Sequence, residues 1–119
     1  MRILLIEDGQ RVAHFIERGL KEEGFVIDVA SDGEKGLYLS QVNSYDLIIL
    51  DVMLPKLNGY EVCRKIKIEH DSPIPVLMLT AQDSDTDRII GRVKGADFYM
   101  TKPFGANELL MNINALLNH

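Results

Sequence analysis

Four short segments of the chain have the hydrophobic pattern of buried strands, and each is followed at once by a polar or charged residue. The segments and their endings are 3–6 before Glu7 and Asp8, 47–50 before Asp51, 76–79 before Thr80, and 97–101 before Lys102. Continuous apolar runs of this length are typical of parallel strands that are buried on both faces. Helix-length segments separate them, so the pattern predicts alternating strands and helices.

The remaining hydrophobic positions complete this alternation. Strands are predicted at 2–6, 26–30, 45–50, 76–79 and 97–101. Apolar residues recur at helical spacing between them: Val12, Phe15, Ile16 and Leu20 in the first helix, Val62, Cys63 and Ile66 in the third, Ile89, Ile90 and Val93 in the fourth, and Leu109, Ile113, Leu116 and Leu117 in the last. Ser31 with Glu34 three residues later is a capping-box signature, which predicts that a second helix begins there and runs to about Val42.

Five such units predict an α/β fold, with a doubly wound five-stranded parallel sheet and five helices. If the connections are right-handed, as is usual, the strand order is the flavodoxin-like 2-1-3-4-5. A length of 119 residues suits one domain, 1–119.

Composition narrows the class of protein. Hydrophobic residues make up 46% of the chain and charged residues 26%, which is ordinary for a soluble globular domain. The formal net charge of -5 argues against direct binding of nucleic acid. The one cysteine, Cys63, cannot form an internal disulfide, which fits a reducing compartment. The sequence has no signal-peptide pattern and no membrane-spanning run, so we expect a cytoplasmic protein with no membrane partner.

The polar residues that follow the strands should meet in space, because ligands of an open parallel sheet bind outside the carboxyl ends of its strands. Three carboxylates, one hydroxyl and one ammonium would then share one crevice. A carboxylate can accept a phosphoryl group, but its charge repels the phosphoryl oxygens unless a divalent cation bridges them. The residue set therefore predicts phosphoryl transfer with Mg²⁺, or Mn²⁺, as the cofactor.

Each side chain has a natural place in such a site. The cation ligands that we expect are Asp8 and Asp51 directly, Glu7 through a water molecule, and the backbone carbonyl of Met53. The ammonium of Lys102 would neutralise a phosphoryl oxygen. The hydroxyl of Thr80 would donate a hydrogen bond to another oxygen, and would thereby sense whether the phosphoryl group is present.

Each motif alone also has a simpler explanation. Glu7-Asp8 would usually be a helix cap, Asp51 a turn residue, Thr80 an ordinary strand end and Lys102-Pro103 a loop dipeptide. Their joint occurrence, in this order and after successive strands, favours the functional interpretation.

These motifs resemble a known family along essentially the whole chain. The segments that carry the resemblance are Ile6-Glu7-Asp8, the run from Leu50-Asp51 to Leu54-Pro55 with Asn58-Gly59, Leu79-Thr80-Ala81, and the run from Gly95-Ala96-Asp97 to Lys102-Pro103-Phe104. The chain is identified as a member of the response-regulator receiver domains of two-component signalling, and is most similar to the receivers of winged-helix transcription regulators.

The resemblance implies a role for each of these residues. Asp51 would accept a phosphoryl group from a histidine kinase, or from a phosphotransfer protein, and the domain would catalyse only this transfer and its own dephosphorylation. Lys102-Pro103 would be a cis peptide, and Tyr99 would be a switch aromatic that turns inward when Thr80 moves toward the phosphoryl group. The surface of the fourth helix, fifth strand and fifth helix would then change and control an output domain or partner, with transcription as the expected output.

The chain departs from those receivers at the surface where they form ion-paired dimers. Arg88 and Glu108 fit the pattern, but Phe98 and Asn112 stand where charged residues are usual. An apolar homodimer contact through Phe98 is therefore the expectation. Two further positions, Met53 and Gln82, would flank the phosphoryl group and tune its hydrolysis.

Two other functions fit parts of the pattern. A phosphohydrolase that forms an aspartyl phosphate would carry an acid two residues after its nucleophile, where this chain has Met53, which cannot transfer a proton. A receiver-like module that binds partners without taking phosphate would keep the fold but not the reaction. The sequence leaves open whether the chain is free-standing or a piece of a longer regulator with a DNA-binding output domain.

Overall fold

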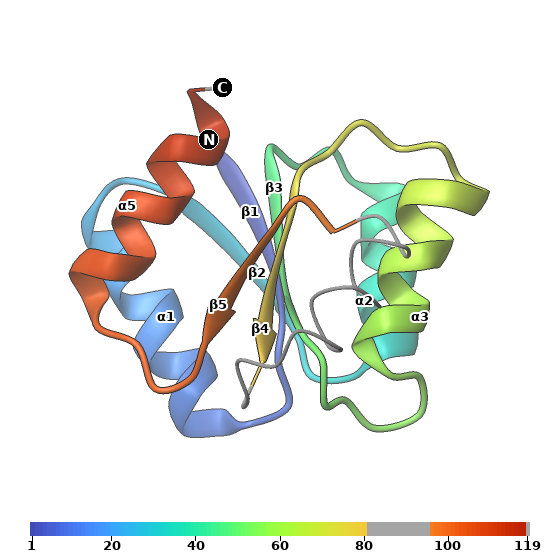
Figure 1. The fold of residues 1–119 in the computed structure, drawn as a ribbon, viewed down its shortest axis with the longest axis horizontal. Coiled ribbons are helices and arrows are strands. Elements are labelled where there is room, and N and C mark those ends of the chain that lie inside the picture. The colour runs from blue at the N-terminus through green and yellow to red at the C-terminus, as the bar shows by residue number, and fades with distance from the viewer. Residues whose placement is uncertain (81–95, 119) are drawn as a thin grey trace.

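The computed structural model describes residues 1–80 and 96–118, which form a parallel sheet with helices on both faces (Figure 1). The strands are β1 (Arg2–Ile6), β2 (Val26–Ala30), β3 (Leu47–Asp51), β4 (Val76–Thr80) and β5 (Phe98–Thr101). They pair in the order β2-β1-β3-β4-β5, and every pair is parallel. The predicted doubly wound, flavodoxin-like sheet is confirmed.

The hydrophobic pattern explains which strands lie in the middle of the sheet. β3 and β4 are buried along their whole length and β1 along nearly all of it, as their continuous apolar runs require. The edge strands β2 and β5 are partly exposed, and their sequences mix polar with apolar residues. The polar strand endings therefore belong to the central strands and to the β5 edge.

Four helices cover the two faces of the sheet in the described part of the chain. α1 (Gln10–Glu22) and α5 (Ala106–Leu117) lie on one face, and α2 (Gly33–Val42) and α3 (Gly59–Arg64) lie on the other (Figure 1). A π-helical turn, η1 (Lys65–Glu69), continues α3. Each face encloses its own hydrophobic core, one built around Ile3, Leu5, Ile16 and Leu109, the other around Leu4, Ile6, Val62 and Met78. The predicted fourth helix, with Ile89, Ile90 and Val93, falls outside the described residues.

Two local predictions are wrong in detail. The cap of α2 is Asp32, whose carboxylate accepts the Lys35 amide at 2.8 Å, and not Ser31, because the helix begins one residue later than the capping-box pattern predicts. Phe15 shares the helical stripe of the buried Ile16 and Leu20, yet it is 47% exposed. It stands at the edge of the stripe, where its ring contacts Phe104 with ring centroids 6.4 Å apart.

The third strand begins at Leu47, two residues later than predicted. The preceding Tyr45 is buried and its hydroxyl donates a 2.7 Å hydrogen bond to Asp28, which the guanidinium of Arg2 also contacts at 2.7 Å. These contacts explain how the acidic Asp28 is accommodated inside strand β2. Within residues 1–80 and 96–118, no helix has both the length and the apolar character needed to cross a membrane.

Candidate functional site

The carboxyl ends of four strands meet at one edge of the sheet and bring the predicted polar residues together. In the register of the sheet, Ile6 of β1 lies beside Leu50 of β3, Asp51 beside Leu79 of β4, and Thr80 beside Thr101 of β5. Glu7 and Lys102 directly follow β1 and β5. The strand register therefore places residues from positions 7 to 102 of the sequence in one crevice.

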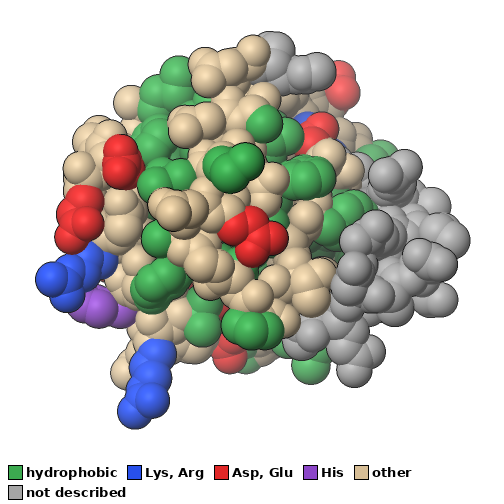
Figure 2. Space-filling model, turned by 60° about the vertical axis from the view of Figure 1, so that its left-hand side comes forward, with side chains coloured by type: hydrophobic (Ala, Val, Ile, Leu, Met, Phe, Trp, Pro, Cys, Tyr) green, Lys and Arg blue, Asp and Glu red, His purple; other side chains and the backbone are tan. Residues whose placement is uncertain are grey.

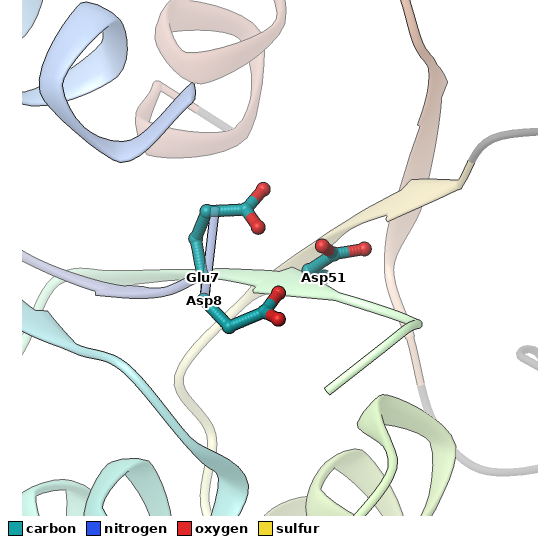
Figure 3. A group of neighbouring side chains, drawn as sticks. All are labelled: Glu7, Asp8 and Asp51. Carbon is teal, nitrogen blue, oxygen red and sulfur yellow. The ribbon is translucent and has the colours of Figure 1, made fainter. Parts of the chain in front are cut away.

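Three carboxylates form the acidic part of this site. Glu7, Asp8 and Asp51 each offer an oxygen, and these oxygens lie within 4.8 Å of one another (Figure 3). Glu7 and Asp51 are only 3% and 4% exposed, whereas Asp8 is exposed to solvent. Two buried carboxylates and one accessible one thus converge at the sheet edge.

The ammonium of Lys102 lies against the two buried carboxylates. It donates hydrogen bonds of 2.9 Å to both Glu7 Oε1 and Asp51 Oδ2. Burial alone would lower the pKa of Lys102, but these two hydrogen bonds outweigh it, so the pKa lies above its ordinary value. The lysine is therefore a fixed positive charge beside Asp51.

Glu7 has an unusual protonation equilibrium. Burial, together with the neighbouring carboxylate of Asp51, raises the pKa of Glu7 from 4.5 to about 7, although Lys102 and the Gly9 amide oppose the shift. The Gly9 amide donates a 3.0 Å hydrogen bond to Glu7 Oε2, a contact that the sequence pattern did not predict. Glu7 can therefore exchange a proton near neutral pH, unlike an ordinary surface glutamate.

The loop after β3 begins with close contacts around Asp51. The Met53 amide donates a 3.2 Å hydrogen bond to Asp51 Oδ1, and the Gly59 amide donates to the Val52 carbonyl at 2.9 Å. A Cβ at position 59 would overlap the carbonyl oxygen of Asp51, so only glycine permits this approach. In the sequence, Asn58-Gly59 carries part of the family resemblance, but the pattern did not predict this contact. The Met53 side chain is exposed at the rim of the site.

Thr80 and Tyr99 lie on neighbouring strands beside the acidic cluster. Thr80 is 5% exposed, and its carbonyl accepts the Lys102 amide at 2.7 Å. Tyr99 is partly buried against the hydrophobic core that contains Met78. The Lys102-Pro103 peptide is cis.

The remaining predicted residues lie away from the cluster or outside the described part of the chain. Phe98, Glu108 and Asn112, together with Met111, line a surface hollow of about 680 Å³ between β5 and α5. Gln82 and Arg88 fall within 81–95, outside the described residues.

The donor set fits a small, hard divalent cation. Glu7, Asp8 and Asp51 offer only oxygen ligands, the kind that Mg²⁺ and Mn²⁺ prefer. One accessible carboxylate beside two buried ones leaves room for the water ligands that Mg²⁺ keeps. The residues present are therefore compatible with a magnesium site.

Comparison with known proteins agrees with this arrangement. Residues 3–114 match the family model of the response regulator receiver domain. Over 117 residues the chain is 46% identical to the transcriptional regulatory protein HprR of Escherichia coli strain K12. The aligned region covers 98% of this chain and 52% of HprR. The chain thus spans about half the length of the curated relatives that it matches.

Solved structures show the same fold. The receiver domain of Francisella response regulator 1452 superposes with a TM-score of 0.92 at 36% identity, covering 98% of this chain and 96% of that one. The receiver domain of the sensor histidine kinase PA1611 of Pseudomonas aeruginosa PAO1, described with a magnesium ion coordinated in its active-site cleft, gives 0.91 at 30% identity, covering 99% and 98%. The chain therefore belongs to the family of response regulator receiver domains.

Proposed function

We propose that Asp51 accepts a phosphoryl group from the phosphohistidine of a sensor histidine kinase or phosphotransfer protein, in a reaction that needs Mg²⁺. The phosphorylated domain then controls an output domain or partner in transcription. The observation that carries this proposal is the position of Asp51, which is nearly buried at the end of β3 between two other carboxylates and the Lys102 ammonium. A buried carboxylate surrounded in this way is a candidate nucleophile and not a structural turn residue.

The reaction is a direct displacement at phosphorus. One carboxylate oxygen of Asp51 attacks phosphorus, and the new P–O bond forms as the P–N bond to the kinase histidine breaks. The electron pair of that bond stays on the imidazole nitrogen, which leaves as neutral imidazole if the other ring nitrogen carries a proton and otherwise takes a proton from solvent. The ammonium of Lys102 can transfer its hydrogen bond from Asp51 to a phosphoryl oxygen, which stabilises the added charge. Glu7, Asp8, Asp51 and the Met53 carbonyl would hold Mg²⁺, which when bound would offset the negative charge of the attacking carboxylate and of the phosphoryl group.

Thr80 and Tyr99 would transmit the effect of phosphorylation from the site to the surface of β5 and α5. Phosphorylation adds negative charge and strong hydrogen-bond acceptors at the end of the sheet. The Thr80 hydroxyl is on the strand next to Asp51, so a shift toward the phosphoryl group would change the packing beside Tyr99 and the surface of β5 and α5. A coupling of about 1–3 kcal/mol is enough to bias a two-state surface of this kind. Met53 and Gln82 would set how fast the phosphoryl group is hydrolysed.

The surface of β5 and α5 fits an apolar homodimer contact in the phosphorylated state. Phe98 and Met111 are 41% and 72% exposed, and α5 carries a single charged residue, Glu108. The view that brings this side of the molecule forward shows apolar side chains around an acidic side chain in the middle of the face, with Lys and Arg side chains at its lower left margin (Figure 2). The curated relatives are about twice as long as this chain, which supports an output domain that this chain does not contain.

The test is intact-mass measurement after incubation with acetyl phosphate and Mg²⁺. We expect one added phosphoryl mass in the wild-type protein, none in chelator and none in Asp51→Asn. Asp71→Asn is the matched control, because Asp71 is an exposed aspartate in the loop before β4, at the other end of the sheet. An added mass that persists in Asp51→Asn would show that another residue is the acceptor.

A wild-type protein that gains no mass would point to the phosphate-independent binding module. Slow formation and fast hydrolysis must first be separated from a true lack of reactivity. Beryllofluoride with Mg²⁺ does this, because it mimics the bound phosphoryl group without turnover. Binding of beryllofluoride with no phosphoryl mass would indicate slow formation or fast hydrolysis of the aspartyl phosphate, whereas the absence of both beryllofluoride binding and a phosphoryl mass would contradict the proposal.

A further inference from the structure

The loop that carries Met53 is held at its far end by the turn before α2. Residues 52–58 connect β3 to α3, and Leu57 lies near their end. Gly33, the first residue of α2, is buried against Leu57, and a Cβ at position 33 would overlap the Leu57 carbonyl oxygen. The same Cβ would lie 3.0 Å from Leu57 Cβ and 2.9 Å from Val62 Cγ2. The first residue of α2 and the loop are therefore in backbone contact at a point where only glycine fits.

Hydrogen bonds hold both ends of this loop, where the Met53 amide donates to Asp51 Oδ1 and the Gly59 amide donates to the Val52 carbonyl. Lys56 has a left-handed backbone with φ of 69°, and the Leu57 amide closes a tight turn with a 2.8 Å hydrogen bond to the Pro55 carbonyl. The ion pair between Lys56 Nζ and Asp32 Oδ2 is 3.7 Å long and solvent-exposed on the lysine side, so it is weak. The far end of the loop is restrained by the contact with Gly33, by the packing of the Leu57 side chain against the core that contains Val62, and by the Asn58 cap of α3.

We propose that Gly33 is a positioning residue for the divalent-cation site. Gly33 lets α2 approach Leu57 directly and so holds the far end of the 52–58 loop close to α2. The position of this loop in turn places the Met53 carbonyl relative to Glu7, Asp8 and Asp51. This inference rests on the proposed function, in which that carbonyl is a cation ligand. A larger residue at position 33 must push the Leu57 backbone away, and the displaced loop would carry Met53 out of register with the carboxylates.

The same helix offers a matched control. A Cβ at Gly36, one turn further along α2, would also be crowded, but by the side chain of Ile6, whose atoms lie at 2.5–2.9 Å. Gly36→Ala therefore strains α2 against the core, and Gly33→Ala strains it against the loop. Both variants should lower the thermal midpoint, but only Gly33→Ala should disturb the cation site.

The test measures cation affinity directly, through the loss of the free Mn²⁺ electron paramagnetic resonance signal on titration with protein. Mutation of groups that position metal ligands commonly weakens affinity by about 10-fold to 100-fold, so we expect Gly33→Ala to raise the Kd for Mn²⁺ about 10-fold. Gly36→Ala should keep the Kd within about twofold of wild type, because its strain falls on the Ile6 side chain in the core and not on the backbone of the loop that carries Met53.

Each outcome separates the inference from the function on which it rests. A Gly33→Ala protein that is folded and binds Mn²⁺ like wild type would overturn the role of Gly33 and leave the cation site standing. A wild-type protein that does not bind Mn²⁺ would overturn both. If Gly33→Ala does not fold, the double variant Gly33→Ala with Leu57→Gly removes the 3.0 Å contact between the two Cβ atoms but keeps the overlap with the carbonyl oxygen of residue 57, so the loop should still be displaced. A folded double variant with wild-type affinity would also contradict the proposal.

Discussion

Lys102 Nζ lies 2.9 Å from Asp51 Oδ2, although the two residues are 51 positions apart in the sequence. The same ammonium lies 2.9 Å from Glu7 Oε1. Without a bound cation, the lysine therefore carries the positive charge that offsets the two buried carboxylates. A divalent cation and the lysine would act on the same carboxylates, so their effects must be coupled.

Replacing the ammonium should strengthen cation binding while slowing phosphorylation. In Lys102→Met, a positive charge close to the cation ligands is lost, so the electrostatic repulsion of an incoming Mg²⁺ falls. We expect the Kd for Mg²⁺, measured by calorimetry, to tighten several-fold, and phosphorylation by acetyl phosphate to slow at least about 10-fold, because a positive charge on the phosphoryl oxygens is missing. Lys65→Met, in the η1 turn, should change neither quantity. Weaker Mg²⁺ binding in Lys102→Met would contradict this coupling.

The stability of the cation-free protein should depend on pH through Glu7. The pKa of Glu7 is about 7 in the folded protein, above its ordinary value of 4.5, so the folded state binds this proton more tightly than the unfolded chain. Its contribution to stability is therefore complete below pH 4.5 and is lost as the pH rises through 7. Linkage gives a loss of about 2 kcal/mol between about pH 5 and pH 7.5 from this group alone.

The measurement is urea unfolding in chelator at several pH values, for wild type and Glu7→Gln. The amide mimics the protonated acid and does not titrate. Between about pH 5 and pH 7.5 the free energy of unfolding of the variant should therefore fall by about 2 kcal/mol less than that of wild type. The variant should also be the more stable of the two at about pH 7.5. Parallel pH profiles for the two proteins would show that Glu7 is not the group responsible.

Asp8 should matter for the cation more than for the fold. It is exposed, so its repulsion with Glu7 and Asp51 is screened by water, and Asp8→Asn should raise the thermal midpoint in chelator only slightly. Wild type should gain about 2.7 kcal/mol of stability at an Mg²⁺ concentration of 100 times Kd. Asp8→Asn should lose most of this gain in differential scanning calorimetry, whereas Asp71→Asn should keep it. An unchanged response to Mg²⁺ in Asp8→Asn would remove Asp8 from the ligand set.

The sheet and the location of the site were predictable from the sequence because both depend on local patterns. Continuous apolar runs identify the buried strands, and each run ends at a polar residue, so the sequence alone assigns Glu7, Asp51 and Thr80 to one edge of the sheet. The topology rule for parallel sheets supplies the rest, since it requires the carboxyl ends of the strands to lie on the same side.

What the sequence could not predict depends on contacts between distant residues. The hydrogen bond from Lys102 to Glu7 joins residues 95 positions apart, and nothing in either motif indicates it. The backbone contact between Gly33 and Leu57 has no sequence signal beyond the glycine itself. Phe15 shares an apolar stripe with Ile16 and Leu20 but is 47% exposed, and helical spacing cannot tell the edge of a buried stripe from its centre.

Association of the phosphorylated protein should depend on Phe98. Its ring is 41% exposed on β5 beside the exposed Met111 of α5, and burying such side chains contributes about 1.5–3 kcal/mol each. Phe98→Asp places a charge in this contact, so we expect the dimer Kd of the beryllofluoride-bound protein to rise at least about 10-fold in analytical ultracentrifugation. Phe15→Asp is the matched control, since Phe15 has a similar exposed fraction, 47%, but lies on α1. Equal association in Phe98→Asp and wild type would exclude this contact, and a loss in Phe15→Asp alone would place the interface on α1 instead.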